Sequence, residues 1–275
     1  MRLHGRIALV PGASRPVGRA IARRFGKEGA TLVLPVHDWP ESTREMTEEF
    51  EERGFAYMTM PVDLRVGEAV AALAATIEER FGRLDFLINN IERGGMPVVH
   101  GSYDQPHNSG QWELEIATTL TAKWLLYRQC LPLLQRTGGA AVVNVTSIAA
   151  MTGRSGPAAL VFNDGYSAAN RGVSSFTETW AREAGPAVRV NEVMLGLING
   201  RHGDQTRGWG ALAQEQRDEL VRHTLLRRTG LPEEVAAAVL FVAVDAAYMT
   251  GAVLRLDGGF VLGGDRVPAM PPGIL

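Results

Sequence analysis

Short apolar runs alternate with longer helical patterns along nearly the whole chain. The apolar runs are typical of strands at residues 6–10, 30–35, 55–62, 84–89, 140–146, 188–194 and 252–256. Between them, apolar residues recur with helical spacing at 17–28, 41–53, 67–81, 111–135, 166–184 and 232–247. Strands that are apolar throughout and alternate with helices predict a parallel sheet covered on both faces. We therefore expect an α/β fold with a doubly wound sheet of about seven strands.

The chain has 275 residues without a repeat or linker, so we expect one domain over residues 1–275. A net charge of −2 gives no support for nucleic acid or an anionic membrane as partner. No apolar run approaches the roughly 20 residues that span a bilayer, and residues 1–10 lack the apolar core of a signal peptide. The single cysteine, Cys130, lies in an apolar stretch, which favours a packed thiol in a cytoplasmic protein.

The first predicted strand is followed by a glycine-bearing turn, P-G-A-S-R-P-V-G-R-A at residues 11–20. A turn of this kind between a strand and a helix lets main-chain N–H groups meet a pyrophosphate. Gly12 and Gly18 are its glycines. The alternative is a tight turn that binds nothing, and its place directly after the first strand favours the nucleotide.

Further motifs follow in a fixed order: D-L at 63–64, L-I-N-N at 87–90, N-V-T-S at 144–147, a tyrosine at 166, and two C-terminal segments at 230–241 and 249–259. With these motifs the chain resembles the short-chain dehydrogenase/reductase family, in particular its 3-oxoacyl-ACP-reductase-like members, over residues 3–263 or so. The resemblance implies a Rossmann-type domain that binds a nicotinamide dinucleotide, and a homotetramer or homodimer paired through the helices at 111–135 and 166–184. No metal is expected.

The resemblance also implies which residues form the site. The cofactor would be bound by Gly12, Ser14, Arg15, Val17, Gly18, His37, Asp63, Leu64, Asn90, Tyr166, Asn170 and Gly196. The catalytic residues would be Ser147, Tyr166 and Asn170. Ser147 would hold a carbonyl oxygen and Tyr166 would donate a proton, while Asn170 would help to place the nicotinamide ribose.

The chain departs from the family pattern mainly at this site. Asn170 stands where the family has a lysine, Thr119 where it has an asparagine, and Pro16 where it has a glycine. A free phenol has a pKa near ~10, and an ammonium about 5 Å away would favour the tyrosinate by about 3 kcal/mol, roughly two pKa units. Neutral Asn170 does not supply that charge, so we expect the reaction to favour carbonyl reduction over alcohol oxidation.

Other residues could border the pocket. Nineteen positions separate Ser147 from Tyr166, more than is usual in the family, and the extra loop either reshapes the pocket or is a surface excursion. The substrate loop is expected at about 197–228. It contains His202, a spare acid, and Trp209, a candidate lid contact. The remaining candidates are His100 and His107 in a loop, and Arg171, which we expect to face solvent.

The end of the second strand bears on the choice of nicotinamide. Val36 stands where NAD-preferring members of the family usually have an aspartate, so no charge there repels a 2′-phosphate. Arg15 and His37 could contact that phosphate, whereas Asp38 counts against it. We expect NADP(H) rather than NAD(H).

Two functions stay open from the sequence. The first is an NAD(P)-dependent oxidoreductase that reduces a carbonyl of a small or acyl-type substrate. The second is a dinucleotide-binding protein of the same fold without ordinary redox turnover, either a regulatory or structural subunit or a non-redox catalyst.

Overall fold

A seven-stranded parallel sheet forms the centre of the computed structural model, which describes residues 1–91, 110–200, 209, 212–265, 267–271 and 273. The strands are β1 (Ile7–Leu9), β2 (Thr31–Val36), β3 (Tyr57–Pro61), β4 (Phe86–Asn89), β5 (Ala140–Ser147), β6 (Val188–Leu195) and β7 (Val253–Leu256). Their order is β3-β2-β1-β4-β5-β6-β7, and every neighbouring pair is parallel. The predicted doubly wound parallel sheet is confirmed.

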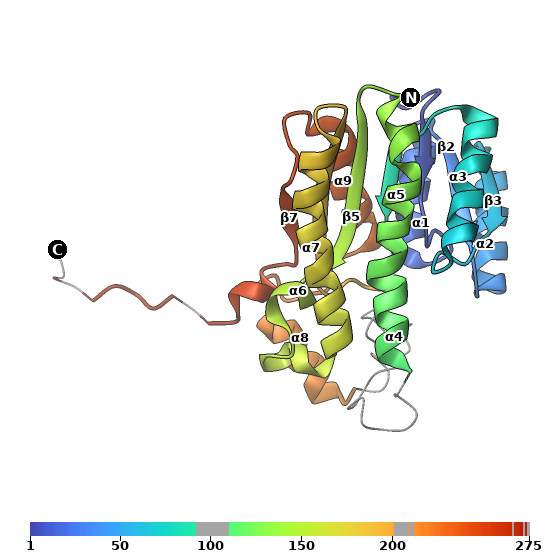
Figure 1. The fold of residues 1–275 in the computed structure, drawn as a ribbon. Coiled ribbons are helices and arrows are strands. Elements are labelled where there is room, and N and C mark those ends of the chain that lie inside the picture. Colours follow the sequence, from blue (N-terminus) through green and yellow to red (C-terminus); the bar gives the residue numbers. More distant parts are fainter. Residues whose placement is uncertain (92–109, 201–208, 210–211, 266, 272, 274–275) are drawn as a thin grey trace.

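Helices cover both faces of this sheet (Figure 1). They are α1 (Pro16–Lys27), α2 (Pro40–Glu52), α3 (Gly67–Phe81), α4 (Gln111–Glu115), α5 (Ala122–Gln135), α6 (Ala149–Thr152), α7 (Asp164–Ala184), α8 (Gln214–His223) and α9 (Pro232–Leu240). Among the described residues, no helix is both long and apolar enough to cross a membrane.

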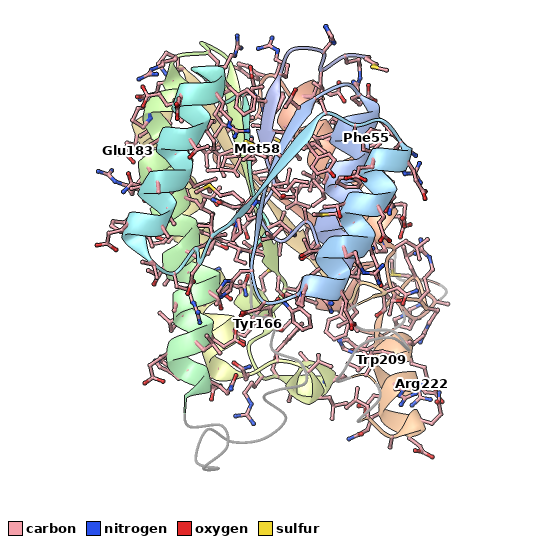
Figure 2. The ribbon with its side chains drawn as sticks, turned by 90° about the vertical axis from the view of Figure 1, so that its right-hand side faces the viewer. Phe55, Met58, Tyr166, Glu183, Trp209 and Arg222 are labelled. Carbon is pink, nitrogen blue, oxygen red and sulfur yellow. The ribbon has the colours of Figure 1, made fainter. Side chains whose placement is uncertain are left out.

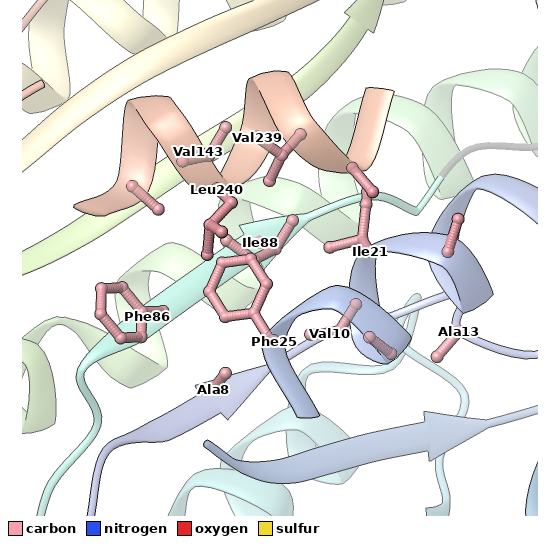
Figure 3. Close-up of a cluster of buried hydrophobic side chains, with 14 of the residues drawn as sticks. Ala8, Val10, Ala13, Ile21, Phe25, Phe86, Ile88, Val143, Val239 and Leu240 are labelled. Carbon is pink, nitrogen blue, oxygen red and sulfur yellow. The ribbon is translucent and has the colours of Figure 1, made fainter. Parts of the chain in front are cut away.

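Two apolar clusters hold the layers together. Figure 3 shows Phe25 of α1 and Leu240 of α9 packed over Val143 of β5 on one face of the sheet. On the opposite face, Leu126 of α5 and Trp180 of α7 pack in a second cluster with β-strand residues. Because alternate residues of a strand point to opposite faces, a strand that serves both clusters has apolar residues at successive positions, as β5 has over 140–143.

Sequence periodicity predicted the long helices closely and missed local features within them. The predicted helix at 111–135 contains a π-helical stretch, Ile116–Thr121, between α4 and α5. The helix predicted at 232–247 is regular only to Leu240 and continues as a π-helical turn, Phe241–Asp245. A wider turn changes which side chains share a face without changing the apolar composition from which a helix is predicted.

The strand order reverses between β1 and β4, which are neighbours although β2 and β3 separate them in sequence. In open α/β sheets, the connections that leave two such strands run in opposite directions and open a crevice at their carboxyl ends. The loop after β1 and Asn90 after β4 meet there, since the Asn90 side chain donates a hydrogen bond to the Pro11 carbonyl at 3.3 Å.

Candidate active site

The loop between β1 and α1 is shaped by its two glycines. Gly12 has φ of +68°, a conformation that favours glycine, and a Cβ there would lie 2.9 Å from the Asn90 carbonyl oxygen. A Cβ on Gly18 would lie 2.2 Å from the Gly12 carbonyl oxygen and 2.7 Å from Asn90 Nδ2. The backbone segments are therefore in contact, and only glycine fits at either position.

Pro16 does not disturb this loop. It is the first residue of α1, where a main-chain N–H would have no partner within the helix, so proline is tolerated. Its ring lies against Gly200, where a Cβ would meet Pro16 Cβ at 2.9 Å. The N-terminus of α1 consequently forms with a proline in place of the family glycine, and Pro16 supports the segment after β6.

These features fit the pyrophosphate of a dinucleotide. The two close-packed glycines hold the loop at the N-terminus of α1, where main-chain N–H groups favour an anion. Around them, Ser14 is buried, and Val17 packs against the apolar cluster of α1 and α9. Asn90 holds the loop from the side of β4.

The predicted adenosine side carries arginine, histidine and carboxylate side chains. The guanidinium of Arg15 lies 4.2 Å from the centroid of the Trp39 ring. His37 Nε2 lies 3.3 Å from a carboxylate oxygen of Asp38 and 3.9 Å from one of Asp63. Arg65 donates two hydrogen bonds to the Asp63 carboxylate, at 2.8 and 2.6 Å, and these hold the pKa of that carboxyl at about 2. Asp63 is thus a fixed anion, and Leu64 beside it is buried in the core.

Ser147 and Tyr166 come together beyond the sheet. Ser147 ends β5, and Tyr166 lies in the first turn of α7, which begins at an Asn163 cap whose side chain accepts the Tyr166 N–H at 2.7 Å. Burial raises the pKa of the Tyr166 phenol well above its usual range; hydrogen bonds with the side chains of Ser147 and Asn170 oppose that rise. The phenol is therefore protonated at neutral pH.

The side chain of Asn170 ties α7 to β5. It is fully buried, its Oδ1 accepts the Ser147 N–H at 3.1 Å, and its Nδ2 donates to the Tyr166 carbonyl at 2.9 Å. Asn170 thus positions both catalytic candidates, a role that sequence reasoning did not assign to it. Its predicted contact with a ribose stays a prediction, and Arg171 is exposed, as expected.

Two buried charged residues near the site were missed by sequence reasoning. Glu115, the last residue of α4, is fully buried, and its negative charge contributes to the high pKa of Tyr166. Lys123 of α5 is also fully buried and donates a hydrogen bond to the Val145 carbonyl at 2.7 Å. A sequence signal existed for Lys123, because the chain has only one other lysine, Lys27, and Lys123 stands in the run T-A-K-W-L-L.

The long segment between Ser147 and Tyr166 packs over the tyrosine. It forms α6 and a 3₁₀ helix, Gly156–Leu160, and its Phe162 ring stacks near Tyr166 with centroids 5.9 Å apart. Trp209, labelled with Tyr166 in Figure 2, is buried in the same apolar cluster. Of the two alternatives for this segment, the structure supports a wall of the site rather than a surface excursion.

The remaining candidates have different outcomes. Gly196 packs tightly on the residue after β7, since a Cβ there would lie 2.6 Å from Asp257 Cα. Its predicted contact with the cofactor stays a prediction. His100, His107 and His202 lie outside the described residues. No group of three or more potential metal ligands occurs among the residues that the structure describes.

Comparisons with known proteins agree with this geometry. A family model described as enoyl-(acyl carrier protein) reductase matches residues 12–261. Glucose 1-dehydrogenase 2 of Bacillus subtilis is 31% identical over 265 residues, which cover 94% of this chain and 96% of that protein. The 3-oxoacyl-(acyl-carrier-protein) reductase of Vibrio harveyi is 32% identical, covering 95% of this chain and 100% of the relative.

A solved structure also matches nearly the whole chain. A Burkholderia xenovorans protein described as a short-chain dehydrogenase/reductase superposes with a TM-score of 0.78 at 29% identity, covering 95% of this chain and 98% of its own. Sequence and structure therefore agree from end to end, and the chain belongs to the short-chain dehydrogenase/reductase family of oxidoreductases.

Proposed function

We propose that the protein is an NADP(H)-dependent reductase of a carbonyl in a small or acyl-type substrate. The observation that carries the proposal is the meeting of the Ser147 and Tyr166 hydroxyls at the carboxyl edge of the sheet, the edge from which the Gly12–Gly18 loop also rises. A protonated phenol held by a second hydroxyl is suited to donate a proton to an oxygen that is gaining charge.

A nicotinamide held by the residues of this edge would supply the hydride that reduces the carbonyl carbon. The Ser147 hydroxyl holds the carbonyl oxygen, and the Tyr166 phenol transfers its proton to that oxygen, so that hydride and proton together give the alcohol. The tyrosinate that remains is stabilised by hydrogen bonds from Ser147 and Asn170 rather than by a neighbouring ammonium. Because burial and Glu115 oppose the tyrosinate, the reduction direction is favoured.

The preference for NADP(H) is supported by the charges beside the loop. Arg15 and His37 are exposed, and Val36 at the end of β2 carries no carboxylate, whereas Asp38, 3.3 Å from His37 Nε2, counts the other way. Replacing Arg15 by Gln should weaken NADPH binding at least about tenfold and NADH binding less than about threefold, because a charge-assisted contact to the 2′-phosphate is lost. Fluorescence titration of both cofactors measures this, with Arg44→Gln, an exposed arginine on α2, as the control.

Further parts of the proposal follow the family. Residues 1–275 would act as one unit with a substrate loop at about 197–228. The protein would work in the cytoplasm as a homotetramer or homodimer, without nucleic acid or membrane as partner.

Cofactor titration followed by turnover measurements tests the function. We expect NADPH to bind and to be oxidised in the presence of activated ketones, and Tyr166→Phe to abolish the oxidation while NADPH still binds. NADPH binding without oxidation, unchanged in Tyr166→Phe, would instead support the non-redox scaffold.

A further inference from the structure

The strand that carries Ser147 extends beyond its neighbour. β4 ends at Asn89, which pairs with Asn144, whereas β5 continues to Ser147. Alternate residues of a parallel strand direct their main-chain groups to opposite neighbours. The Ala141 N–H bonds Asp85 on the β4 side, and the Ile148 N–H bonds Leu195 on the β6 side. The main-chain groups of Val145 and Ser147 therefore point to the side on which β4 has already ended.

Two buried side chains take the place of the missing strand. Lys123 Nζ donates to the Val145 carbonyl at 2.7 Å, and Asn170 Oδ1 accepts the Ser147 N–H at 3.1 Å. Both side chains are fully buried, and they come from different helices, α5 and α7. The free edge of β5 is thus held by one cationic donor and one neutral amide.

A carboxyl group on the next strand offsets part of the desolvation of Lys123. Glu192 of β6 is fully buried opposite Asn144, and its negative charge favours the protonated lysine, against desolvation. The Glu192 carboxylate accepts hydrogen bonds from Thr146 of β5 and, at 2.9 Å, from Ser174 of α7. Ser174 lies one turn after Asn170 and also donates to its carbonyl at 3.4 Å. Lys123 and Glu192 therefore belong to the layer directly beneath Ser147 and Asn170.

We propose that Lys123 is a positioning residue of the active site, and that it and Asn170 are exchanged partners: among the described residues the buried amine of this edge stands at position 123, so position 170 carries a neutral amide rather than a second amine. Val145 and Ser147 are two residues apart on an extended strand, so groups bonded to them lie within roughly 7 Å of each other. A lysine at 170, where the family resemblance places one, would put a second ammonium beside Lys123 in a buried setting.

A double-mutant cycle tests the exchange. The variants are Lys123→Met, Asn170→Lys and the double variant, with Lys27→Met, the exposed second lysine, as matched control. At about pH 6, where Lys123 with its pKa of about 7 is protonated, Asn170→Lys alone should lower the urea midpoint and should not raise kcat, because it adds like charge. Lys123→Met should lower kcat at least about tenfold with the Kd for NADPH within about twofold, because it releases the edge that carries Ser147 without touching the phosphate loop. The double variant should be more stable than Asn170→Lys.

If the changes in urea midpoint of the two single variants add up to that of the double variant, the proposed exchange between positions 123 and 170 is wrong. Unchanged kcat in Lys123→Met would contradict the positioning role. If Lys123→Met does not fold, Lys123→Gln replaces it, since Gln keeps a neutral donor for the Val145 carbonyl. The kcat measurement rests on the proposed reductase function, whereas the urea unfolding measurement does not. Absence of turnover in the wild type therefore contradicts the function alone, and the unfolding data still decide the exchange.

Discussion

At the scale of single residues, the environment of Tyr166 supports the proposed direction of the chemistry. Its ring is buried against Phe162 and the apolar cluster around it, and burial is the largest cause of its high pKa. An acid with a high pKa keeps its proton at neutral pH and gives it up only to an oxygen of comparable basicity, such as the alkoxide that forms during carbonyl reduction. The same group is a poor base for alcohol oxidation.

The pH dependence of the two directions should therefore differ. Reduction needs protonated Tyr166, so its kcat should show no loss from this group between about pH 6 and 9, below the pKa of the residue. Oxidation needs the tyrosinate, so its kcat should rise about tenfold per pH unit over the same range. Steady-state rates in both directions measure this. A reduction rate that fell tenfold between about pH 7 and 8 would contradict the assignment of Tyr166 as the acid.

Lys123 should titrate far below an ordinary lysine. Desolvation lowers its pKa from 10.5 to about 7, against the opposing charge of Glu192. Because the chain has only two lysines, NMR of protein labelled at the lysine side chains gives two signals, and Lys27→Met assigns them. We expect a midpoint within about one unit of 7 for Lys123. A midpoint above about 10 would show that the amine is solvated and would contradict its burial.

Residues of this kind explain what the sequence alone did not reveal. Ser147, Tyr166 and Gly12 were predicted because a motif surrounds each of them. Lys123, Glu115 and Glu192 belong to no motif, and their function depends on which strand or helix they meet after folding. The rarity of lysine was a visible signal at position 123, but the Val145 carbonyl that it binds is set by the point at which β4 ends.

At the scale of elements, the loop between β1 and α1 is the most constrained segment. Gly18→Ala would place a Cβ 2.2 Å from the Gly12 carbonyl oxygen, so the strand–helix turn would have to open. We expect destabilisation of about 1–3 kcal/mol and loss of NADPH binding of at least about tenfold. Urea unfolding and cofactor titration measure the two effects.

Gly139→Ala is the matched control for that variant, because an added Cβ at Gly139 meets nothing within 4 Å. It should leave the Kd for NADPH unchanged. Equal cofactor binding by Gly18→Ala and the control would show that the loop does not form the pyrophosphate site.

Element boundaries were predicted best where a single face is apolar. The helices at 67–81 and 111–135 have the predicted limits, apart from the π-helical stretch inside the second. The helix α8 was not predicted, since Leu220 is its only fully buried residue and the rest is strongly polar. The short helices after β5 were missed because they are ordered by packing around Tyr166 rather than by their own periodicity.

At the scale of the whole molecule, the site exists because the sheet order reverses between β1 and β4. That reversal brings Gly12, Asn90 and Ser147, from three separate parts of the chain, to one carboxyl edge. Periodicity predicted the parallel sheet, whereas the order of its strands was seen only in the structure. The same packing encloses Lys123, so the stability of the whole domain depends on the ionisation of one residue.

Global stability should consequently increase with pH near neutrality. Lysine in the unfolded chain has its ordinary pKa of 10.5, and folded Lys123 has one of about 7. Between these values the unfolded chain binds a proton that the folded chain has released, so raising the pH favours folding. From about pH 7 to 8.5, the free energy of unfolding should rise by about 2 kcal/mol relative to Lys123→Met.

Urea unfolding at several pH values measures that difference. The pH range ends below the ordinary pKa of cysteine. Burial raises the pKa of Cys130 to about 12 in the folded protein. At higher pH the unfolded chain would lose this proton first, so the free energy of unfolding would fall. In Lys123→Met the pKa of Glu192 rises further, because the lysine no longer favours its carboxylate. The free energy of unfolding of the variant therefore increases less with pH, which enlarges the expected difference from the wild type. Parallel curves for wild type and variant would contradict a depressed pKa at position 123.

The central claim is that hydride passes from a nicotinamide to a carbonyl beside Tyr166. The most direct test is reduction of an activated ketone with NADPH that carries deuterium at both positions of C4, followed by mass spectrometry of the alcohol. The account predicts deuterium on the carbinol carbon with the wild type and its loss with Tyr166→Phe. A protein that binds this cofactor and transfers no deuterium to any ketone of the panel would contradict it.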